Sequence, residues 1–489
     1  MQYAYLSAKT LIEMIKSKQI SSVELLNYFF KRVNEVNPKI NAIISINEDY
    51  AIKRARSADN AVARGEYLGA LHGLPITVKD VYEVEGFPVS SGTPFYKEHV
   101  VTKNADIVQR LVDEGAVIFG KTNVPFFAGD WQTYNSVYGT TNNPWNTEMT
   151  CGGSSGGPAA ALAAGLTPVE VGSDLGGSIR IPAHYCGVYG HRPTYGITSI
   201  RGHIPGEPGD LAIPDLSSAG VMARTADDLE LMLDVVCGAP YPYSVGWKLE
   251  LPKPKAKELK EYRVFAWFYD DFCQIDRSIE TKYNEVVKKL IENGVSVTEG
   301  RPEGYELKEI YKIMRNLSGS VVSTGLPLLY RLLIKAIIPF LSIAKDSSLS
   351  RSWLDYLKGM IQGHSHWLEL DEQRAKMKHL CAALFDKYDV LITPVAPCTA
   401  FPHNHRPIIL RKLEINGIKR PYTDHIPWIA PATVFGLPAT SVPVGLNEKG
   451  MPVNLQVIGG PFMDRVTIDF AKKLEDASIG GFVKPKTIE

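Results

Sequence analysis

Two short glycine-rich segments carry serines that could act as nucleophiles. The first is GGSSGG at residues 152–157, and the second is DLGGS at residues 174–178. Glycines allow turns that side chains would block, and they leave the backbone amides uncovered. A serine hydroxyl attacks a carbonyl when a base takes its proton and when amide donors stabilise the oxyanion that forms. The two segments therefore suggest acyl-transfer chemistry, with a serine presented beside backbone donors.

The base for such a serine is not evident from the sequence. Three histidines, His184, His191 and His203, lie near the glycine-rich segments, but none stands in a recognisable triad pattern. Lys79 lies in the apolar stretch ITVKD, which predicts a short buried strand. Because lysine is rarely fully buried, the simplest interpretation of Lys79 is a residue at a strand end whose amine reaches solvent.

The first segment also matches the GxSxG nucleophile elbow twice, centred on Ser154 and on Ser155. That motif requires a strand directly before the serine, whereas residues 143–151, NPWNTEMTC, are polar and typical of a turn. The α/β-hydrolase interpretation is therefore disfavoured. A phosphate-binding loop is disfavoured as well, because no GK[ST] follows the glycines and no GxGxxG follows a strand.

The composition of the 489-residue chain is that of a globular protein, with 45% hydrophobic and 22% charged residues. Lysine plus arginine, 53, equals aspartate plus glutamate, 53, so no nucleic-acid partner is expected and a small, mostly uncharged substrate is favoured. The six cysteines lack metal-binding spacing and predict reduced thiols, no metal and a cytoplasmic protein. The N-terminus has no apolar signal-peptide core, which predicts no export.

Alternating helical and strand patterns must position these residues. Two amphipathic helices open the chain, and the second has Ser21 and Glu24 as a capping box and Asn37-Pro38 at its end. A third helix is predicted from Tyr50 to Arg64. Strand-like VIFGKTN, YRVFAWF, VSVTE, YDVLITP and ATSVPVG then alternate with helical segments. This pattern predicts an α/β fold with a central mixed, largely parallel, twisted β-sheet covered on both faces by helices.

Residues 304–373 interrupt the alternation with a long helical region. It contains the apolar run VVSTGLPLLYRLLIKAIIPFLSIAK, but Arg331 and Lys335 make it a poor membrane span. A core or subunit-facing helix pair is the favoured interpretation, and an entrance cap that meets a membrane surface is the alternative. We therefore expect a single domain over residues 1–489, with a helical segment at 1–65 and a helical insertion at 304–373.

Five motifs, in this order and near these spacings, resemble those of the amidase signature family. They are ITVKD with Lys79, GKTN at residues 120–123, NNPW at 142–145, GGSSGG at 152–157, and DLGGSIRIPA at 174–183. The resemblance covers nearly the whole chain and ends with GLPATSVPVG and LQVIGGPFMD. Ser178 follows Ser154 by 24 positions, which is the spacing of that family.

The resemblance implies an amidase with a Ser–cis-Ser–Lys triad and no cofactor. Ser178 would be the acylated nucleophile, and Ser154, reached through a cis peptide bond from Gly153, would relay protons. Lys79 would be the base, because burial disfavours the charged form of a lysine and lets it act as a proton acceptor. The implied reaction is the hydrolysis of an amide C–N bond through an acyl-enzyme.

The second glycine-rich segment would hold the oxyanion. Consecutive amides could surround one oxygen, and the candidate donors are those of Leu175, Gly176, Gly177 and Ser178. Loss of one such donor typically costs about 3 kcal/mol of transition-state stabilisation. We expect Ser155 to support the site by hydrogen bonding, and we expect Asp174 and Arg180 to form an ion pair that braces the loop.

The expected substrate is a small-molecule amide. Phe126, Phe127 and Trp131 follow GKTN and, with Ile204, suggest an apolar pocket. Such a pocket would favour a hydrophobic or aryl amide, or an ester or carbamate of similar shape. The alternative is that these aromatic residues are simply part of the core.

The same family contains the glutaminase (A) subunit of the tRNA-dependent amidotransferase, which is an alternative function. Those subunits carry an acidic residue ten positions before the C-terminal GLP, where this chain has Ile426, with Asp424 two positions away. This departure favours a stand-alone amidase, as a monomer or homodimer for which membrane contact is disfavoured. A non-catalytic binding protein that kept the fold is a further alternative, which intact Lys79, Ser154 and Ser178 disfavour.

Overall fold

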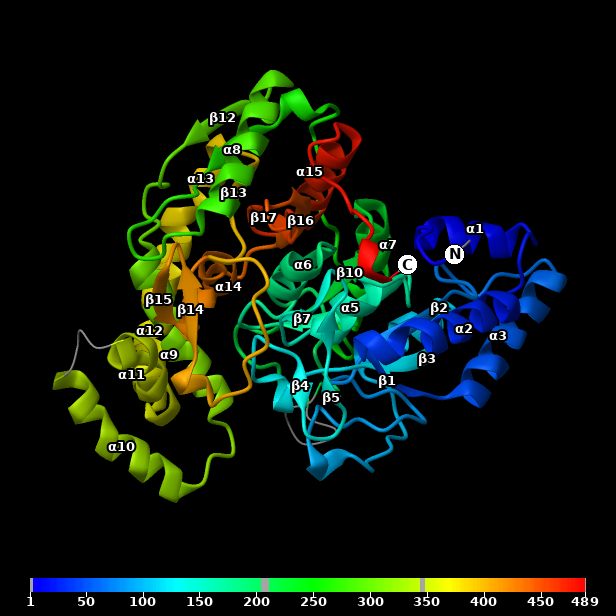
Figure 1. The fold of residues 1–489 in the computed structure, drawn as a ribbon, viewed down its shortest axis with the longest axis horizontal. Coiled ribbons are helices and arrows are strands. Elements are labelled where there is room, and N and C mark those ends of the chain that lie inside the picture. Colours follow the sequence, from blue (N-terminus) through cyan, green and yellow to red (C-terminus); the bar gives the residue numbers. More distant parts are fainter. Residues whose placement is uncertain (1–2, 204–210, 344–347, 489) are drawn as a thin grey trace.

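The computed structural model describes residues 3–203, 211–343 and 348–488. The N-terminal part of the chain forms helices beside a small sheet (Figure 1). The helices are α1 (Ala8–Lys16), α2 (Ser22–Ile40) and α3 (Glu48–Ala63). The sheet has the order β1-β3-β2, in which β2 (Pro75–Lys79) is parallel to β3 (Val117–Thr122) and β1 (Ile43–Ile46) is antiparallel to β3. Lys79 is the last residue of β2.

Helix α2 begins as predicted but ends later. The hydroxyl of Ser21 accepts from the N–H of Glu24 at 3.1 Å, and the Glu24 carboxylate accepts from the N–H of Ser21 at 2.9 Å, which confirms the capping box. The predicted end at Asn37-Pro38 is wrong, since the helix includes Pro38 and continues to Ile40. The Asn37 side chain closes the helix, because its oxygen accepts from the next two backbone amides after Asn41, at 2.9 Å each.

An eight-stranded mixed sheet forms the centre of the fold (Figure 1). Every residue of the strands β8, β10 and β17 is buried. Because successive side chains of a strand point to opposite faces, both faces of the sheet are covered, as predicted. In spatial order the strands are β12 (Ser296–Glu299), β11 (Arg263–Ala266), β13 (Val390–Pro394), β17 (Pro452–Ile458), β16 (Ala439–Leu446), β9 (Tyr189–Arg192), β10 (Ser218–Ala223) and β8 (Val169–Asp174).

The mixed sheet confirms the predicted α/β class, but its strands are not largely parallel. Only the pairs β12-β11 and β11-β13 are parallel, and the other neighbouring pairs are antiparallel. Strands β8 and β9, joined by α6 (Arg180–Cys186), point the same way, since both are antiparallel to β10. Strand β10 comes later in the chain and lies between them. Alternation along the sequence therefore indicated the α/β class, but it predicted neither this crossover nor the strand inserted into it.

The remaining helices pack around the two sheets. The alanine-rich segment between the two glycine-rich turns forms α5 (Gly156–Ala163), which is buried throughout and packs against α6 and β8. Helices α7 (Ala226–Val236) and α15 (Asp464–Asp476) pack against each other. The other helices are α4 (Asp106–Asp113), α8 (Arg277–Glu292), α13 (Leu384–Lys387) and α14 (Ala430–Phe435), and the short strands are β4 (Tyr134–Asn135), β5 (Gly139–Thr140), β6 (Asn142–Asn143), β7 (Asn146–Thr150), β14 (Lys412–Ile415) and β15 (Ile418–Pro421).

The predicted helical region consists of α9 (Leu307–Val322), α10 (Leu328–Ile343), α11 (Ser348–Ile361) and α12 (His364–Ala382). Helix α9 is largely buried, whereas α10 lies at the periphery (Figure 1) with exposed apolar side chains such as Phe340, at 74% exposure. The core interpretation therefore fits α9 and is wrong for α10. The subunit-facing and entrance-cap interpretations of α10 stay predictions. Among the described residues, no helix has both the length and the apolar character needed to cross a bilayer.

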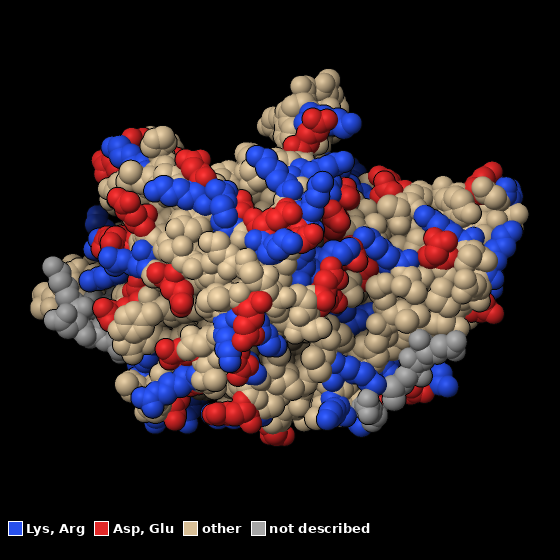
Figure 2. Space-filling model, turned by 90° about the horizontal axis from the view of Figure 1, so that it is seen from above, with Lys and Arg blue, Asp and Glu red and all other residues tan. Residues whose placement is uncertain are grey.

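Charges of both signs are mixed on the face of the molecule that Figure 2 shows. Lysine and arginine side chains lie between aspartate and glutamate side chains over most of that face, with apolar and neutral surface around them. This distribution agrees with the equal totals of 53 basic and 53 acidic residues in the sequence. The face carries no broad region of a single sign.

Candidate active site

Lys79 ends β2 with its amine inside the protein. The residue has 0% exposure, and all of β2 is buried with it. Its Nζ lies 2.8 Å from Ser154 Oγ and 3.0 Å from Ser173 Oγ. The interpretation of Lys79 as a lysine that reaches solvent is therefore wrong, because β8 packs against β2 and covers the side chain.

Burial controls the protonation of this amine. Removal of Lys79 from water penalises the charged form and lowers its pKa to about 7, against the opposing charge of Asp174. An ordinary lysine has a pKa of about 10.4 and is almost entirely charged at neutral pH. A substantial fraction of Lys79 is therefore neutral near pH 7, with a lone pair that can accept a proton.

Ser154 lies in the turn between β7 and α5. Its peptide bond with Gly153 is cis, as predicted. Gly153 has no room for a side chain, because a Cβ atom there would overlap the carbonyl oxygen of Asp130. The prediction of a turn without a strand over residues 143–151 is wrong, since β7 pairs with β6 as a hairpin. The polar sequence concealed this hairpin, which lies outside the central sheet and so differs from the strand of a nucleophile elbow.

The second glycine-rich segment forms the turn between β8 and α6. The N–H of Ser155 donates to the carbonyl oxygen of Ser178 at 3.0 Å, which joins this turn to the first segment. Ser178 is partly exposed, whereas Lys79 and Ser154 are buried. The two turns thus place a serine that solvent can reach beside a buried serine and a buried lysine.

One of the four predicted oxyanion donors is already occupied. The N–H of Gly177 donates to Asp174 Oδ1 at 3.1 Å. Within the part of the chain that the structure describes, no backbone hydrogen bond occupies the N–H groups of Leu175, Gly176 and Ser178. Gly177 has a φ of +87°, a conformation that glycine adopts readily. The candidate oxyanion hole therefore narrows to the amides of Leu175, Gly176 and Ser178.

The predicted ion pair between Asp174 and Arg180 is confirmed. Arg180 donates through one nitrogen to Asp174 Oδ1 at 2.8 Å and through another to Oδ2 at 3.0 Å, and both side chains have 0% exposure. Burial alone would raise the pKa of Asp174, but the charge and hydrogen bonds of Arg180 outweigh it and lower the pKa to about 2. Arg180 also donates to Ile429 O at 3.0 Å, to Thr433 Oγ1 at 2.8 Å and to Gln456 Oε1 at 2.7 Å.

An Asp174→Ala variant should lose about 3–5 kcal/mol of unfolding free energy at neutral pH, because it leaves the Arg180 guanidinium buried without its carboxylate. The native contribution should depend on pH. The folded pKa of about 2 lies below the value of about 3.9 for an unfolded aspartate, so the contribution is complete above about pH 4 and is lost as the pH falls through about 2. Urea unfolding at several pH values measures both effects.

The exposed pair of Arg64 and Glu66 provides the control for this experiment. Its side chains are 59% and 60% exposed, so Glu66→Ala should leave the unfolding midpoint unchanged. Equal midpoints for Asp174→Ala and the native protein would show that the buried pair does not brace the turn.

Ser155 supports the site through its backbone and not through its side chain. Its N–H holds Ser178, but its buried Oγ has no hydrogen-bond partner among the described residues. The predicted hydrogen-bonding support is therefore confirmed, and it comes from the backbone. The Ser155 hydroxyl lies against Gly172, where an added Cβ atom would be only 2.9 Å from it.

The predicted pocket residues do not form one cluster. Trp131 lies beside the glycine-rich turn at residues 174–178 (the oxyanion turn), because its Nε1 donates to the carbonyl oxygen of Gly176 at 2.9 Å. Phe126 and Phe127 contact each other, and Phe127 packs with Tyr96 against a small separate cluster. Ile204 lies outside the described residues. Of the four, Trp131 is the one that the described contacts bring to the candidate site.

Two residues near Lys79 were not assigned to the site from the sequence. Ser173 precedes Asp174 at the end of β8, and its Oγ lies between Lys79 Nζ and His203 Nε2, at 3.0 and 2.9 Å. His203 was considered as a base and set aside, yet it reaches this network. The signal for Ser173 was present, since a serine that directly precedes the DLGGS turn at a strand end is well placed to face the site.

The other two histidines hold the fold together. His184 accepts from the N–H of Asn454 at 2.7 Å and lies 3.3 Å from the carbonyl oxygen of Cys398, and burial lowers its pKa to about 4. His191 lies between Thr440 Oγ1 and Asp464 Oδ1, at 2.9 and 3.1 Å. Neither histidine has a described contact with the two serine turns.

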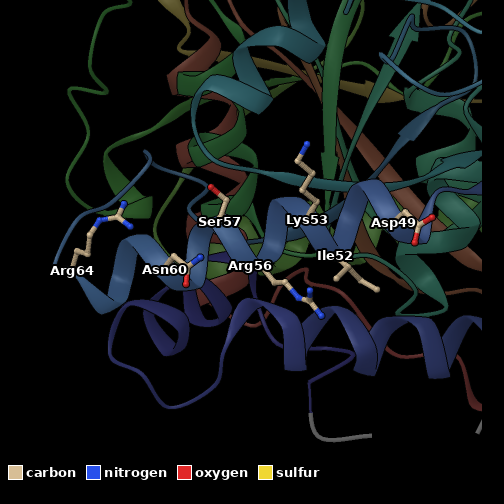
Figure 3. A pocket seen from close by; sticks show the side chains of 7 residues that line it. All are labelled: Asp49, Ile52, Lys53, Arg56, Ser57, Asn60 and Arg64. Atoms are coloured by element: carbon tan, nitrogen blue, oxygen red, sulfur yellow. The ribbon is translucent and has the colours of Figure 1, made fainter.

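A surface depression lies apart from this site, on the outer helix α3. Figure 3 shows the side chains that line it, which come from one helix and point in several directions. None of them belongs to the turns or strands that carry Lys79 and the serines. The lining residues are Asp49, Ile52, Lys53, Arg56, Ser57, Asn60 and Arg64.

The chain is similar to known proteins over most of its length. The family model described as Amidase matches residues 24–468. The A subunit of the Glutamyl-tRNA(Gln) amidotransferase of Carboxydothermus hydrogenoformans is 31% identical over 503 residues, a match that covers 99% of this chain and 100% of that protein. A solved structure described as a vestigial protein complex, which reveals the evolutionary origins of an s-triazine catabolic enzyme, is 26% identical with a TM-score of 0.80, covering 98% of this chain and 100% of that one.

A bacterial aryl acylamidase of the amidase signature family shares the fold, with a TM-score of 0.79 at 23% identity over 98% of this chain and 97% of that one. The family model spans most of the sequence, and the curated relative covers nearly all of it. This chain therefore belongs to the amidase-signature family of enzymes, which act on the C–N bonds of amides.

Proposed function

We propose that the chain hydrolyses an amide through an acyl-enzyme on Ser178, with Ser154 as the proton relay and Lys79 as the base. The observation that carries this proposal is the distance of 2.8 Å between Lys79 Nζ and Ser154 Oγ, combined with a pKa of about 7 for Lys79. A buried lysine that is partly neutral and touches a serine has the requirements of a general base.

The proposed reaction begins with the attack of Ser178 Oγ on the carbonyl carbon of the amide. The proton of Ser178 passes to Ser154 as the proton of Ser154 passes to Lys79. The amides of Leu175, Gly176 and Ser178 stabilise the oxyanion. When the C–N bond breaks, a proton returns from Lys79 through Ser154 to the departing nitrogen. Water then attacks the acyl ester by the same route, which releases the acid and restores the three side chains.

The geometry around the turns supports an uncharged, apolar amide as the substrate. The Trp131 indole flanks the oxyanion turn. The charged groups next to it are already paired, since Arg411 binds Asp130 at 2.6 Å and both side chains are almost fully buried. Recognition of a free amino acid requires carboxylate and ammonium partners, and a group engaged in a buried pair is costly to recruit. We therefore place a hydrophobic or aryl amide first, with esters and carbamates of similar shape as further substrates.

The second candidate is the glutaminase activity of an amidotransferase A subunit. The curated relatives carry that name, and they support this candidate more directly than they support a generic aryl amidase. In this case the chain would release ammonia from glutamine as one part of a larger enzyme. Near the position where the acidic residue of those subunits was expected, the chain has buried Ile426, and the Asp424 carboxylate is bound by Arg420 at 2.8 Å.

A panel of amides separates the two candidates. The isolated chain should release aniline from simple anilides at a kcat/KM at least about tenfold above that for ammonia release from glutamine, because the Trp131 face buries apolar surface that glutamine lacks. Coupled assays for aniline and for ammonia measure both products, with Ser178→Ala as the blank. Ammonia release that clearly exceeds aniline release would favour the glutaminase and overturn the choice of an apolar amide.

A further inference from the structure

Lys79 makes a second hydrogen bond that the proposed reaction does not use. Its Nζ lies 3.0 Å from Ser173 Oγ, and Ser173 Oγ lies 2.9 Å from His203 Nε2. The His203 ring is held edge-on against the ring of Tyr82, with the centroids 5.2 Å apart. Tyr82 is itself fixed, because its hydroxyl donates to the carbonyl oxygen of Gly172 at 2.8 Å. A continuous chain of contacts therefore runs from Lys79 through Ser173 to His203.

The direction of these hydrogen bonds decides what Lys79 can do. A neutral amine has two N–H donors and one lone pair, and a base must turn that lone pair toward the proton that it accepts. A hydroxyl can both donate and accept. If the Ser173 hydroxyl donated to Lys79, it would occupy the lone pair that Ser154 needs. If it donated elsewhere, its oxygen would accept an N–H of Lys79 and leave the lone pair for Ser154.

His203 is suited to take the Ser173 proton. Burial and the charge of Lys79 lower the pKa of His203 to about 3, so its ring is neutral at ordinary pH. In the tautomer with the proton on Nδ1, the Nε2 atom is an acceptor that faces Ser173 Oγ. The Ser173 hydroxyl then donates its proton to His203. Toward Lys79, the Ser173 oxygen can therefore act only as an acceptor.

We propose that His203 is a positioning residue that acts through Ser173 to turn the lone pair of Lys79 toward Ser154. This inference rests on the proposed function of Lys79 as the base. His203 touches no reacting atom in this arrangement. By accepting the Ser173 proton, His203 keeps the Ser173 hydroxyl from competing with Ser154 for the lone pair of Lys79.

Other groups around Lys79 set its charge but not the direction of its lone pair. The Asp174 carboxylate raises the pKa of Lys79 against burial, whereas burial raises the pKa of Glu170 itself to about 8, so Glu170 is mostly neutral near pH 7 and adds to this effect only at higher pH. Asp174 is bound by Arg180, and the Glu170 carboxyl accepts from Thr77 Oγ1 at 2.5 Å. Lys121, on the neighbouring strand β3, lies 3.3 Å from Asp80. Within the described residues, Lys79 Nζ forms its hydrogen bonds with Ser154 and Ser173.

The test uses a fluorophosphonate probe, because the rate at which it labels Ser178 does not depend on the unidentified substrate. His203→Phe keeps a ring against Tyr82 and removes the acceptor. We expect its labelling rate above pH 8 to fall about tenfold to a hundredfold, since a base that points away loses the advantage of orientation. The midpoint of the rate-against-pH curve should move below the native one, because a hydroxyl that donates to the neutral amine stabilises that form.

Two further variants separate positioning from damage to the fold. His203→Gln restores an acceptor and should recover most of the rate and the native midpoint. Ser173→Ala removes the competing hydroxyl, so Ser173→Ala combined with His203→Phe should label faster than His203→Phe alone. His191→Phe, the same substitution at a buried histidine without a described contact with the serine turns, is the structural control and should leave the midpoint at the native pH.

Each outcome decides between the alternatives. The positioning role would be refuted if His203→Phe had the native midpoint of the rate-against-pH curve. It would also be refuted if the losses of labelling rate in Ser173→Ala and His203→Phe simply added in the double variant. Either result would leave the roles of Ser178 and Lys79 as proposed. A native protein that the probe does not label at Ser178 would refute the proposed function, and the role of His203 would fall with it. Thermal unfolding of every variant confirms that the comparison is made between folded proteins.

Discussion

Ser178→Ala is expected to reduce turnover at least about 10⁴-fold and to abolish labelling by a fluorophosphonate probe. The variant lacks the oxygen that forms the acyl ester, while the oxyanion turn keeps its backbone. The small residual rate would come from the amide donors and from substrate binding alone. Steady-state turnover of the best amide in the panel and peptide mapping of the labelled protein measure the two effects.

Ser155→Ala is the matched control for this experiment. It removes a neighbouring hydroxyl, which is buried and has no partner among the described residues, and it leaves the N–H that holds Ser178. Labelling that survives Ser178→Ala would exclude Ser178 as the nucleophile. A native protein that is folded, unlabelled and inactive on the whole panel would favour a binding protein that kept the fold.

Lys79→Met should lower turnover about 10³-fold or more while the protein stays folded. The methionine side chain is similar in length and cannot accept a proton, so the relay through Ser154 loses its base. Removal of a buried amine also removes the cost of its desolvation, which offsets the two lost hydrogen bonds. Turnover together with the thermal unfolding midpoint tests this, and near-native turnover would exclude Lys79 as the base.

The pH dependence of the native enzyme should follow the protonation of Lys79. Because the neutral amine is the active form, kcat/KM should rise as the pH increases through about 7 and then level off. The unfolding free energy should rise as well between about pH 8 and the pKa of about 10.4 of an unfolded lysine, since the unfolded chain binds the additional proton there. Below about pH 8 the buried Glu170 carboxyl, whose pKa is raised to about 8, offsets this rise. Lys79→Met should lose both dependences.

Lys121 provides the contrast within the same sheet. It is fully buried like Lys79 but is paired with Asp80 at 3.3 Å, and it donates to the carbonyl oxygen of Tyr82 at 2.7 Å. Lys121→Met would leave the Asp80 carboxylate without its cation, so its main effect should be a loss of unfolding free energy. The midpoint of the kcat/KM profile should remain where the native enzyme has it. Loss of the pH dependence in Lys121→Met, as expected for Lys79→Met, would mean that the profile does not report Lys79.

Local patterns were sufficient to predict part of this site. The serine turns could be located because glycine-rich segments shape their own backbone, and the ion pair of Asp174 and Arg180 joins residues of a single turn. The burial of Lys79 could not be predicted, because it depends on β8 packing against β2 from a distant part of the chain. The contact of His203 with Ser173 spans 30 positions and has no local signal.

The arrangement of the sheet was predictable to a similar degree. Alternating helices and strands indicated the α/β class but not the crossover from β8 through α6 to β9. The position of β10 between those strands is decided by pairing between segments that are separated in sequence, and such pairing leaves no periodic pattern. The hairpin of β6 and β7 was missed because its residues are polar and its strands are short.

The bonds of Arg180 to the C-terminal part of the chain have a consequence for biosynthesis. A nascent chain that ends at residue 428 already contains Lys79, Ser154 and Ser178. It lacks Ile429, Thr433 and Gln456, which accept hydrogen bonds from Arg180, the first residue of α6. It also lacks β16 and β17, against which α6 packs. A chain terminated at residue 428 would therefore carry Lys79, Ser154 and Ser178 without the partners that hold Arg180 and α6 in place.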